Sequence, residues 1–290
     1  MTPSQRQQTE IAQEFEFTDH HFNILRTLVN KHSGINLSDA KKQLVYGRIA
    51  RRLRKLDLSG FDAYCRLLKT EPDRELPDFV NAITTNKTGF FREPHHFEFL
   101  ARTAIPGLLK ANADTRRIRI WSAGCSTGQE PYSIAIVLLE TIPHLSQWDV
   151  KVLATDIDSN VLAKGERGVY TEEQISDISA SRLKRWFRKG KGANAGQYRV
   201  SPALQSLIRF KKLNLMHDWP MRGPFDLLFC RNVVIYFDKP TQRKLFERYA
   251  DILVDGGHLI IGHSESLFSV SERYQHLGQT IHQKVGSRES

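Results

Sequence analysis

One stretch of this sequence constrains the fold more than any other: Ile118–Ser133, IRIWSAGCSTGQEPYS. Its apolar start, Ile118–Trp121, is typical of a β-strand and leads into a loop of small residues that contains Gly124 and Gly128. Pro131 then opens a helix, as a first-turn proline does. A strand, a glycine loop and a helix N-terminus in this order place backbone N–H groups and the positive helix end beside any ligand. The stretch therefore predicts a binding or catalytic loop.

The same loop fits two chemistries, because it also has the form of a G-x-S-x-G nucleophile elbow with Ser126 as the nucleophile. The acids and histidines that follow it have the chain order of an α/β-hydrolase: Asp156, Asp226, His258 and His263. Such enzymes, however, need strands before the elbow, one of which leads to a loop that supplies an oxyanion-hole N–H. Here only helices are expected before Arg117. The expected architecture therefore disfavours a hydrolase.

The pattern of the chain changes near Arg117. Residues 18–85 carry apolar side chains at helical spacing and predict a helical N-terminal domain. Beyond it, strands are expected at 118–122, 150–155, 208–213, 225–230 and 258–262, with helices after the first two, a further helix at 241–253 stopped by Asp255–Gly257, and a final antiparallel pair at 274–285. This alternation predicts a mainly parallel sheet covered on both faces, within a domain spanning 86–290. Residues 170–205 interrupt the alternation with RKGKGANAGQYR, which favours an inserted β-hairpin subdomain.

Composition limits the function further. Forty per cent hydrophobic and 26% charged residues are typical of a soluble globular protein. The three cysteines Cys65, Cys125 and Cys230 are odd in number and far apart, which disfavours a disulfide framework or a metal site and predicts a cytoplasmic protein. We expect neither a signal peptide nor a membrane span, which needs about 20 apolar residues. The net charge of +10 indicates an acidic partner: nucleic acid, an anionic membrane surface or an acidic protein.

Two acidic residues indicate what the glycine loop binds. Asp156 ends the following strand, where a carboxylate can accept hydrogen bonds from a ribose diol, although its distance from Gly128 exceeds the usual gap of about 20 residues. The loop also departs from G-x-G-x-x-G, which weakens the case for a pyrophosphate and hence for NAD. Glu130 suits a cationic ligand such as S-adenosylmethionine. By position alone Glu130 could instead complement the helix dipole and Asp156 could form a turn, but together they favour a methyltransferase over a dehydrogenase.

Three segments resemble the chemotaxis receptor methyltransferase family, CheR: Thr84–Pro94 (TTNKTGFFREP), Trp121–Ser133 (WSAGCSTGQEPYS) and Phe225–Gln242 (FDLLFCRNVVIYFDKPTQ). Their order and spacing fit nearly the whole chain. The resemblance implies an α/β fold of the class I S-adenosylmethionine-dependent methyltransferases. This fold has a Rossmann-like, mostly parallel sheet with an antiparallel last strand, an all-helical N-terminal domain and a small antiparallel β insert. It also implies that a methyl group passes from S-adenosylmethionine to glutamate side chains of chemoreceptors, leaving S-adenosylhomocysteine and glutamyl methyl esters in chemosensory adaptation.

The resemblance further implies the site residues. Those expected to bind the cofactor are Asn86, Thr88, Arg92, Glu130, Asp156, Asn214, Leu215, Arg231 and Asn232. Among these, Asp156 would contact the ribose, and Asn214 and Leu215 would flank the adenine. Arg92 and Tyr236 are the expected catalytic residues: the arginine would orient a carboxylate of the substrate or cofactor, as its planar fork can and a lysine cannot, and Tyr236 would face the methyl group. Without the resemblance, a surface ion pair and a core aromatic would explain these two residues.

A basic helix in the N-terminal domain is the expected docking surface for the receptor. In KKQLVYGRIARRLRKL, four basic residues fall on one helical face: Lys41, Arg48, Arg52 and Lys55. A solvated amphipathic helix is the alternative. The resemblance favours docking of the acidic cytoplasmic domain of a methyl-accepting chemoreceptor. The insert at 170–205 is either a plain hairpin or a strand edge that holds a C-terminal receptor peptide.

The sequence is also compatible with two other functions. The basic charge would suit an RNA methyltransferase, which would need base-stacking aromatic residues and would bind nucleic acid with a steep salt dependence. A non-catalytic module that senses S-adenosylmethionine would not need Arg92, Asn232 and Tyr236. We therefore expect an enzyme that binds neither nucleic acid nor the membrane interior.

Overall fold

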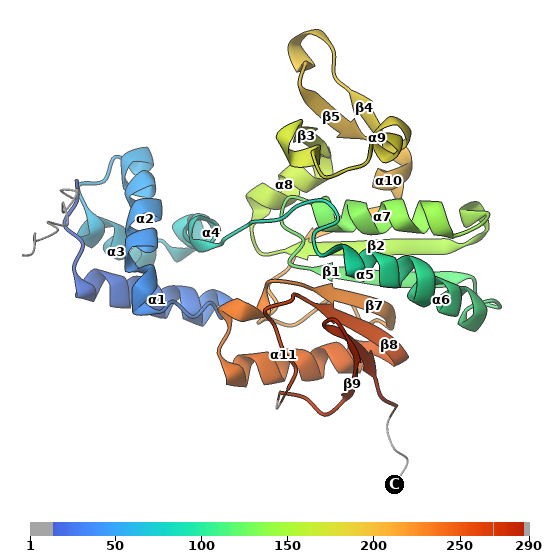
Figure 1. Ribbon diagram of the computed structural model, residues 1–290. Coiled ribbons are helices and arrows are strands. Elements are labelled where there is room, and N and C mark those ends of the chain that lie inside the picture. Colours follow the sequence, from blue (N-terminus) through green and yellow to red (C-terminus); the bar gives the residue numbers. More distant parts are fainter. Residues whose placement is uncertain (1–13, 269, 287–290) are drawn as a thin grey trace, which may run out of the picture. The chain divides into compact units, whose positions relative to one another are not determined.

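The computed structural model describes residues 14–268 and 270–286, and the chain divides into two compact units (Figure 1). Unit 1 contains the described residues up to His32 together with Asn36–Ile83. Unit 2 contains Ser33–Ile35 and the described residues from Thr84 onward. Within this part of the chain, no helix has both the length and the apolar character that crossing a membrane requires.

Unit 1 is built from helices. They are α1 (Asp19–Ser33), the short 3₁₀ turn η1 (Asp39–Lys41), α2 (Lys42–Leu56), α3 (Phe61–Thr70) and α4 (Pro72–Ile83). Each helix turns its apolar stripe inward, so that Leu25, Ile49, Leu53 and Phe79 are completely buried. The left-handed conformation of Asp57, with φ of 53°, ends α2. The predicted all-helical N-terminal domain is confirmed.

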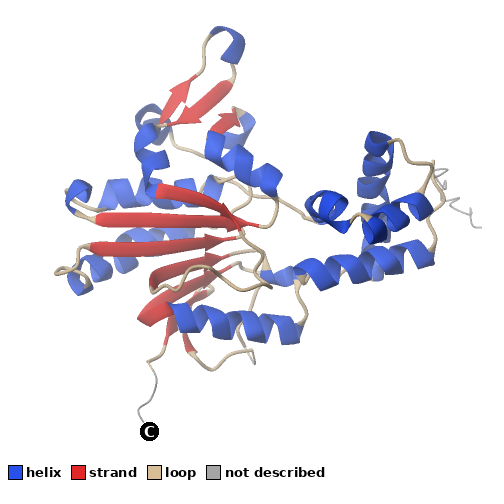
Figure 2. Cartoon of the chain, turned by 180° about the vertical axis from the view of Figure 1, so that it is seen from behind, coloured by secondary structure: helices blue, strands red, loops and turns tan. Residues whose placement is uncertain are grey.

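Unit 2 is organised around a seven-stranded sheet in the order β6-β2-β1-β7-β8-β10-β9 (Figure 2). Its strands are β1 (Arg117–Ala123), β2 (Asp149–Asp156), β6 (Ile208–Lys212), β7 (Phe225–Cys230), β8 (Leu253–Ile261), β9 (Tyr274–Gly278) and β10 (Ile281–Lys284). The first five strands in this order run parallel, and β10 is antiparallel to both β8 and β9. This topology confirms the predicted mostly parallel sheet with an antiparallel end.

Helices cover both faces of the sheet. They are α5 (Pro94–Phe99), the π-helical turn η2 (Leu100–Ala104), α6 (Ile105–Ala111), α7 (Gln129–Thr141), η3 (Leu145–Gln147), α8 (Ser159–Arg167), α10 (Pro202–Leu207), η6 (Val234–Tyr236) and α11 (Lys239–Ile252). Alternate residues of β7 enter two different cores: Leu227 and Phe229 pack with α5–α7, whereas Leu228 and Cys230 pack with α11. Because both faces are covered, β7 is buried along its whole length.

The end of α11 differs from the sequence-based expectation. The helix stops at Ile252, and Asp255–Gly257 lies inside β8 rather than in a loop that stops the helix. The register of β8 against β7 shifts there, since Phe225 pairs with Leu253 but Leu227 pairs with His258. Gly256 has a positive φ of 75°, as expected where a strand bulges. In the sequence, a pair of glycines is compatible with either a helix stop or a β-bulge. In the structure the segment pairs with β7, so it forms a bulge.

A second, smaller sheet lies within unit 2. Its strands are β3 (Val169–Thr171), β4 (Phe187–Lys189) and β5 (Gln197–Val200), and it also contains η4 (Glu173–Ile175), α9 (Ala180–Trp186) and η5 (Gly192–Asn194). The sheet is antiparallel in the order β3-β5-β4, with the β4–β5 hairpin drawn in yellow in Figure 1. The predicted antiparallel insert is therefore confirmed. The additional strand β3 is too short for its alternation to be recognised in the sequence.

Candidate active site

The glycine loop after β1 is held tightly against its neighbours. The N–H groups of Gly124 and Cys125 both donate to the carbonyl oxygen of Thr155 on β2, at 2.8 and 2.9 Å. Gly124 has a φ of 82°, and a Cβ there would lie 2.3 Å from Cγ2 of Val233. Gly128, with a φ of 93°, is similarly crowded by Tyr170. Both positions therefore require glycine, and the loop brings backbone close to whatever binds at this edge of the sheet.

Asp156, at the end of β2, faces this loop. Its carboxylate accepts hydrogen bonds from the N–H groups of Ser126 (2.8 Å) and Asp158 (2.9 Å). Burial raises the pKa of Asp156 to about 6 despite these bonds. The Ser126 hydroxyl donates to the carbonyl oxygen of Asn86 at 2.9 Å, which is not the arrangement of a nucleophile activated by a histidine. The loop is therefore built for binding.

Asp158 is a buried residue of the site that the sequence analysis missed. One oxygen caps α8 by accepting the N–H of Asn160 at 2.8 Å. The other accepts from the Asn86 side-chain amide at 2.7 Å and from the Thr84 hydroxyl at 3.2 Å. Asp158 thus holds the segment that begins TTNKT at the carboxyl edge of the sheet. The sequence TDID shows the cap, but nothing local in it indicates a partner at Asn86.

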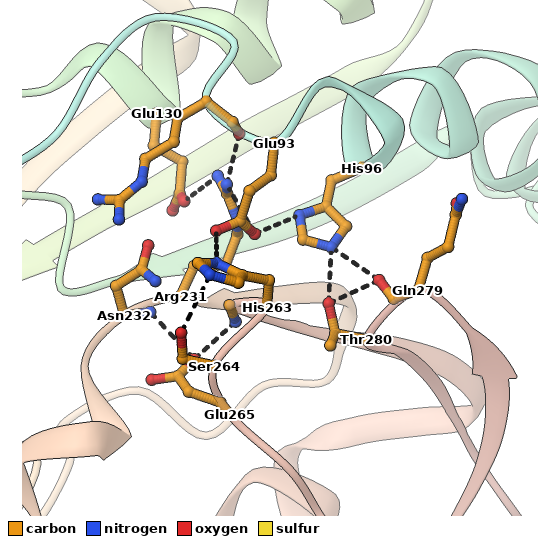
Figure 3. A network of polar contacts seen from close by, with 12 residues as sticks. Glu93, His96, Glu130, Arg231, Asn232, His263, Ser264, Glu265, Gln279 and Thr280 are labelled. Atoms are coloured by element: carbon orange, nitrogen blue, oxygen red, sulfur yellow. Dashed lines mark hydrogen bonds and ion pairs between the residues drawn. The ribbon is translucent and has the colours of Figure 1, made fainter.

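Arg231, directly after β7, is the buried centre of a polar group that we call the Arg231 cluster: Arg231, Glu130, Glu93, His96 and the exposed His263 (Figure 3). The guanidinium of Arg231 lies between two carboxylates, with Nη1 3.0 Å from Oε2 of Glu130 and Nη2 3.2 Å from Oε2 of Glu93. The second oxygen of Glu130 accepts the Ser122 hydroxyl at 2.7 Å. Glu130 therefore lies at the glycine loop, as predicted, but it is already paired with an arginine.

Two histidines complete the Arg231 cluster. His263 donates from Nδ1 to Oε1 of Glu93 at 3.1 Å. His96 is fully buried and donates from Nε2 to the carbonyl oxygen of Gln279 at 3.1 Å, and burial lowers its pKa to about 4. Burial acts to raise the pKa of Glu93, but the charge of Arg231 and the hydrogen bond from His263 hold it below its usual range. At neutral pH the cluster therefore contains an ionised Glu93 beside a neutral His96.

Two members of the cluster, Glu93 and His96, form a possible ligand set for a metal ion together with the neighbouring His95. Glu93, His95 and His96 each offer a ligand atom, and these atoms lie within 4.8 Å of one another. The Glu93 carboxylate, however, is engaged by the guanidinium of Arg231, whose positive charge disfavours a cation beside it. The arrangement suits an internal ion pair better than a metal centre.

The turn after β7 is held by a second buried acid that the sequence analysis missed, Glu265. Its carboxylate accepts the N–H groups of Asn232 (3.0 Å), Val233 (2.9 Å) and Val234 (2.9 Å), and that of Gly262 at 2.6 Å. The left-handed conformation of Asn232, with φ of 59°, directs these donors to one point. Burial raises the pKa of Glu265. Glu265 thereby fixes the turn that leads into η6, on which the partly buried Tyr236 lies.

The remaining expected residues of unit 2 occupy two places. Thr88 and Arg92 lie in the segment before α5, where Nη1 of Arg92 donates to the Lys87 carbonyl oxygen at 2.9 Å. Asn214 and Leu215 follow β6, which is separated from β1 by β2. Hydrogen bonds and ion pairs gather six of the expected residues in one region: Asn86, Arg92, Glu130, Asp156, Arg231 and Asn232. Asn214 and Leu215 follow the strand next to β2 at the same edge of the sheet.

The four basic residues expected to dock a receptor differ in their surroundings within unit 1. Lys41 and Lys55 are exposed. Arg48 donates to the Ile83 carbonyl oxygen, and Arg52 pairs with two acids of α4, with Nε 2.9 Å from Oε1 of Glu75 and Nη1 3.0 Å from Asp78. Only 12% of the Arg52 side chain is exposed. The structure leaves docking untested, but it shows that Arg48 and Arg52 are engaged inside the unit.

Comparison with known proteins identifies the family of this chain. The family described as CheR methyltransferase, SAM binding domain, matches residues 86–283, and the CheR methyltransferase all-alpha domain matches residues 20–84. Chemotaxis protein methyltransferase 2 of Pseudomonas aeruginosa is 45% identical over 271 residues, which are 93% of this chain and 95% of the relative. Chemotaxis protein methyltransferase of Escherichia coli is 39% identical over 276 residues, 94% of this chain and 93% of the relative. The chain belongs to the CheR family of chemotaxis protein methyltransferases.

Proposed function

We propose that this chain transfers a methyl group from S-adenosylmethionine to glutamate side chains on the cytoplasmic domain of chemoreceptors. The observation that carries the proposal is the pair of acids at the glycine loop, Asp156 and Glu130, in a chain of this family. Asp156 is buried at the end of β2, where its carboxylate is suited to accept the two ribose hydroxyl groups. Burial raises the pKa of Asp156, so hydrogen bonds donated by a ligand would stabilise its ionised form.

The charge balance around Glu130 supports a cationic ligand. Arg231 carries one positive charge and shares it between the carboxylates of Glu130 and Glu93, which leaves one negative charge in excess. Nε of Arg231 is a buried donor without a hydrogen-bond partner among the described residues. A ligand with both an ammonium and a carboxylate group, such as the methionine part of the cofactor, complements both features. Glu130, Asp156 and the glycine loop therefore fit S-adenosylmethionine.

For methyl transfer, the protein mainly has to align the attacking oxygen with the methyl group and exclude water. The bound cofactor supplies an electrophilic methyl group on a sulfonium. A glutamate side chain, with a reference pKa of about 4.3, is already ionised at neutral pH and needs no general base. Attack of the carboxylate turns two opposite charges into neutral groups, which a dry pocket favours because water stabilises the charged reactants. In our proposal Arg92 orients the carboxylate and Tyr236 shapes the path of the methyl group.

Release of methanol tests the proposal. Purified chain is incubated with the cytoplasmic domain of a cognate receptor and cofactor tritiated in the methyl group, and the product is then treated with base. We expect volatile tritiated methanol, since a carboxyl methyl ester is labile to base, and a large loss of this signal for Arg92→Ala. Base-stable label in RNA would identify an RNA methyltransferase. Cofactor binding without transfer to any receptor of a panel would identify a sensing module; either result would overturn the proposal.

We also propose that the exposed lysines of unit 1, Lys41 and Lys55, dock the acidic receptor. Replacing both by glutamate is expected to raise KM for the receptor about tenfold while leaving the affinity for S-adenosylhomocysteine unchanged. The matched control, Lys110→Glu with Lys164→Glu, makes the same change in net charge at exposed positions of unit 2. An equal rise in KM for the control would show that net charge alone acts. The pair Arg48→Glu and Arg52→Glu is less informative, because it removes contacts inside unit 1.

The small sheet provides a second contact in our proposal. Its central strand is β5, so β3 and β4 are its edges, and an edge strand can pair with an extended peptide. We expect the C-terminal peptide of a cognate receptor to bind there. Calorimetric titration of that peptide measures the binding, and a Gln197→Pro variant, which disturbs the central strand, should abolish it. Binding unchanged in this variant would place the peptide elsewhere.

A further inference from the structure

The backbone on both sides of Arg92 adopts a conformation that residues other than glycine seldom adopt. Phe91 has a φ of 52° and Glu93 a φ of 58°, both in the left-handed region. Such a conformation persists only where the surrounding contacts impose it. Nη1 of Arg92 donates to the carbonyl oxygen of Lys87, within the same segment, so the direction of the guanidinium depends on this backbone.

Phe91 is held on one side. Its N–H donates to the hydroxyl of Ser133 on α7 at 3.0 Å. Its ring meets Phe97 edge to face, with 5.3 Å between ring centroids, and the guanidinium of Arg182 lies 4.3 Å from its centre. These contacts fix the entry to the turn, but none of them reaches Arg92 or Glu93.

Glu93 is held on the other side by the Arg231 cluster. Nη2 of Arg231 approaches Oε2 of Glu93 (Figure 3). The same nitrogen donates to the backbone carbonyl of Arg92, so it joins two neighbouring residues. His263, from the segment after β8, donates to the other oxygen of Glu93. His96 is a neighbour of Glu93 and does not hold it: its single proton lies on Nε2, which donates to the turn between β9 and β10, so Nδ1, 3.4 Å from Oε2 of Glu93, has no proton to donate. Two segments distant in the chain, the residues after β7 and those after β8, therefore hold the Arg92 turn through Glu93.

We propose that Glu93 is a positioning residue for methyl transfer: its ion pair with Arg231 fixes the turn and thereby aims Arg92 at the reacting carboxylate. The proposal rests on the role for Arg92 proposed above. Glu93 lies next to Arg92 in the chain, and its carboxylate points toward Arg231 and the histidines (Figure 3). Its effect on the reaction passes through the backbone of Arg92.

The variant Glu93→Gln tests this role, because it keeps the shape of the side chain and removes its charge. We expect kcat to fall by up to about 100-fold, the effect of a misplacement of about 1 Å at a catalytic group. The matched control is Glu98→Gln, an exposed glutamate on α5 that makes the same change in charge. Its kcat should equal that of the unchanged chain. If the kcat of Glu93→Gln equals that of the unchanged chain, the proposal is overturned.

A double-mutant cycle with Arg92→Lys separates positioning from a general structural role. If Glu93 acts by aiming Arg92, Glu93→Gln will lower kcat much less in the Arg92→Lys background than in the unchanged chain. Equal losses in the two backgrounds would overturn the proposal. The proposed function would instead fail if the unchanged chain formed no base-labile ester, so the two failures are distinguishable.

Amide hydrogen exchange gives a readout that does not require activity. In Glu93→Gln, the peptide spanning residues 86–98 should exchange faster than in the unchanged chain, whereas Glu98→Gln should not change it. An unchanged exchange rate in Glu93→Gln would show that the ion pair does not hold the turn and would overturn the proposal.

Discussion

Each unit of this protein buries an arginine between two carboxylates, and the two groups differ in how completely their atoms are paired. In unit 1 we call the group the Arg52 cluster: Arg52, Glu75, Asp78 and Tyr64. There Nε and Nη2 of Arg52 each donate to a different oxygen of Glu75, and the Tyr64 hydroxyl donates to the same carboxylate at 2.7 Å. In the Arg231 cluster, Nε of Arg231 and Oε2 of Glu93 lack a hydrogen-bond partner among the described residues.

The difference separates a structural ion pair from a functional one. A bidentate arginine–carboxylate pair with its remaining lone pairs used stabilises the packing of its helices. A buried polar atom without a partner costs free energy, so it persists where another requirement outweighs that cost. We infer that in unit 2 this requirement is the proposed cofactor site, since Arg231 also holds the carbonyl of Arg92 and pairs with Glu130 beside the glycine loop. We therefore expect the Arg52 cluster to govern stability alone, and the Arg231 cluster to govern stability and cofactor binding.

Truncation of Arg52 or Arg231 should lower the free energy of unfolding more than any other substitution proposed here. Arg52→Ala and Arg231→Ala each leave at least one buried carboxylate, Glu75 or Glu130, without its ion pair, which costs about 3–5 kcal/mol in the free energy of unfolding. Only Arg231→Ala should also weaken binding of S-adenosylhomocysteine and lower kcat/KM per folded molecule, because only its partners lie at the glycine loop. Urea unfolding and titration calorimetry measure the two effects.

Arg54→Ala is the control for this pair, since Arg54 is an exposed arginine of the same helix as Arg52. Its unfolding free energy should change by about 0.5 kcal/mol or less. The comparison fails if Arg52→Ala weakens binding of S-adenosylhomocysteine as much as Arg231→Ala does.

Replacing a glycine by alanine should lower the free energy of unfolding in unit 2 and raise it in unit 1. Gly124→Ala places a Cβ 2.3 Å from Val233 at a φ of 82° and should destabilise the chain by about 1–3 kcal/mol while weakening cofactor binding. Gly47→Ala, on an exposed face of α2 with no atom within 4 Å of the new Cβ, should stabilise it by about 0.5–1 kcal/mol. Thermal unfolding of both variants checks the signs. A neutral Gly124→Ala would mean that the loop is looser than its contacts indicate.

Cofactor affinity should depend on pH through Asp156. Burial raises the pKa of this carboxyl to about 6, so it takes up a proton as the pH falls through 6. Its ionised form is the better acceptor for two hydroxyl groups, so the affinity for S-adenosylhomocysteine should be constant above about pH 7. Below about pH 6 it should fall by up to about tenfold per unit. Asp156→Asn should bind more weakly and show a flatter profile from pH 5 to 7. An unchanged slope in this variant would assign the pH dependence to another group.

Removal of one hydroxyl from each cluster should give the smallest effects. Tyr64→Phe removes the donor to Glu75, and Ser122→Ala removes the donor to Glu130 at 2.7 Å. Each should lower the free energy of unfolding by about 1–2 kcal/mol. Ser122→Ala should in addition weaken S-adenosylhomocysteine binding severalfold, as calorimetry would show. If Tyr64→Phe has the same effect on binding, the two clusters are not separate in function.

The sequence predicts the parts of this structure that depend on nearby residues. Strand, glycine loop and first-turn proline lie together in Ile118–Ser133, and Asp156 follows from the end of the next strand. Helical periodicity also places Arg48 and Arg52 on one face of α2. It does not show that this face packs on α4, because periodicity defines a face and not its partner.

The contacts that complete the site join residues far apart in the chain, and for that reason the sequence does not reveal them. Arg231 meets Glu93 and Glu130, Asp158 meets Asn86, and Glu265 accepts the N–H groups after β7. From its neighbours in the sequence, each of these acids would be interpreted as a helix cap, as a residue that complements a helix dipole, or as a surface charge. The sheet order places the ends of β2, β1, β7 and β8 side by side, and thereby brings the residues that follow these strands to one edge.

The most direct test of the account is the position of the transferred methyl group. Receptor cytoplasmic domain incubated with the chain and S-adenosylmethionine is digested, and its peptides are sequenced by tandem mass spectrometry before and after mild base. We predict that one methyl group per modified site lies on glutamate, disappears with base and is absent when Arg92→Ala replaces the unchanged chain. Methylation on lysine or arginine, or methylation that survives base, would contradict the account.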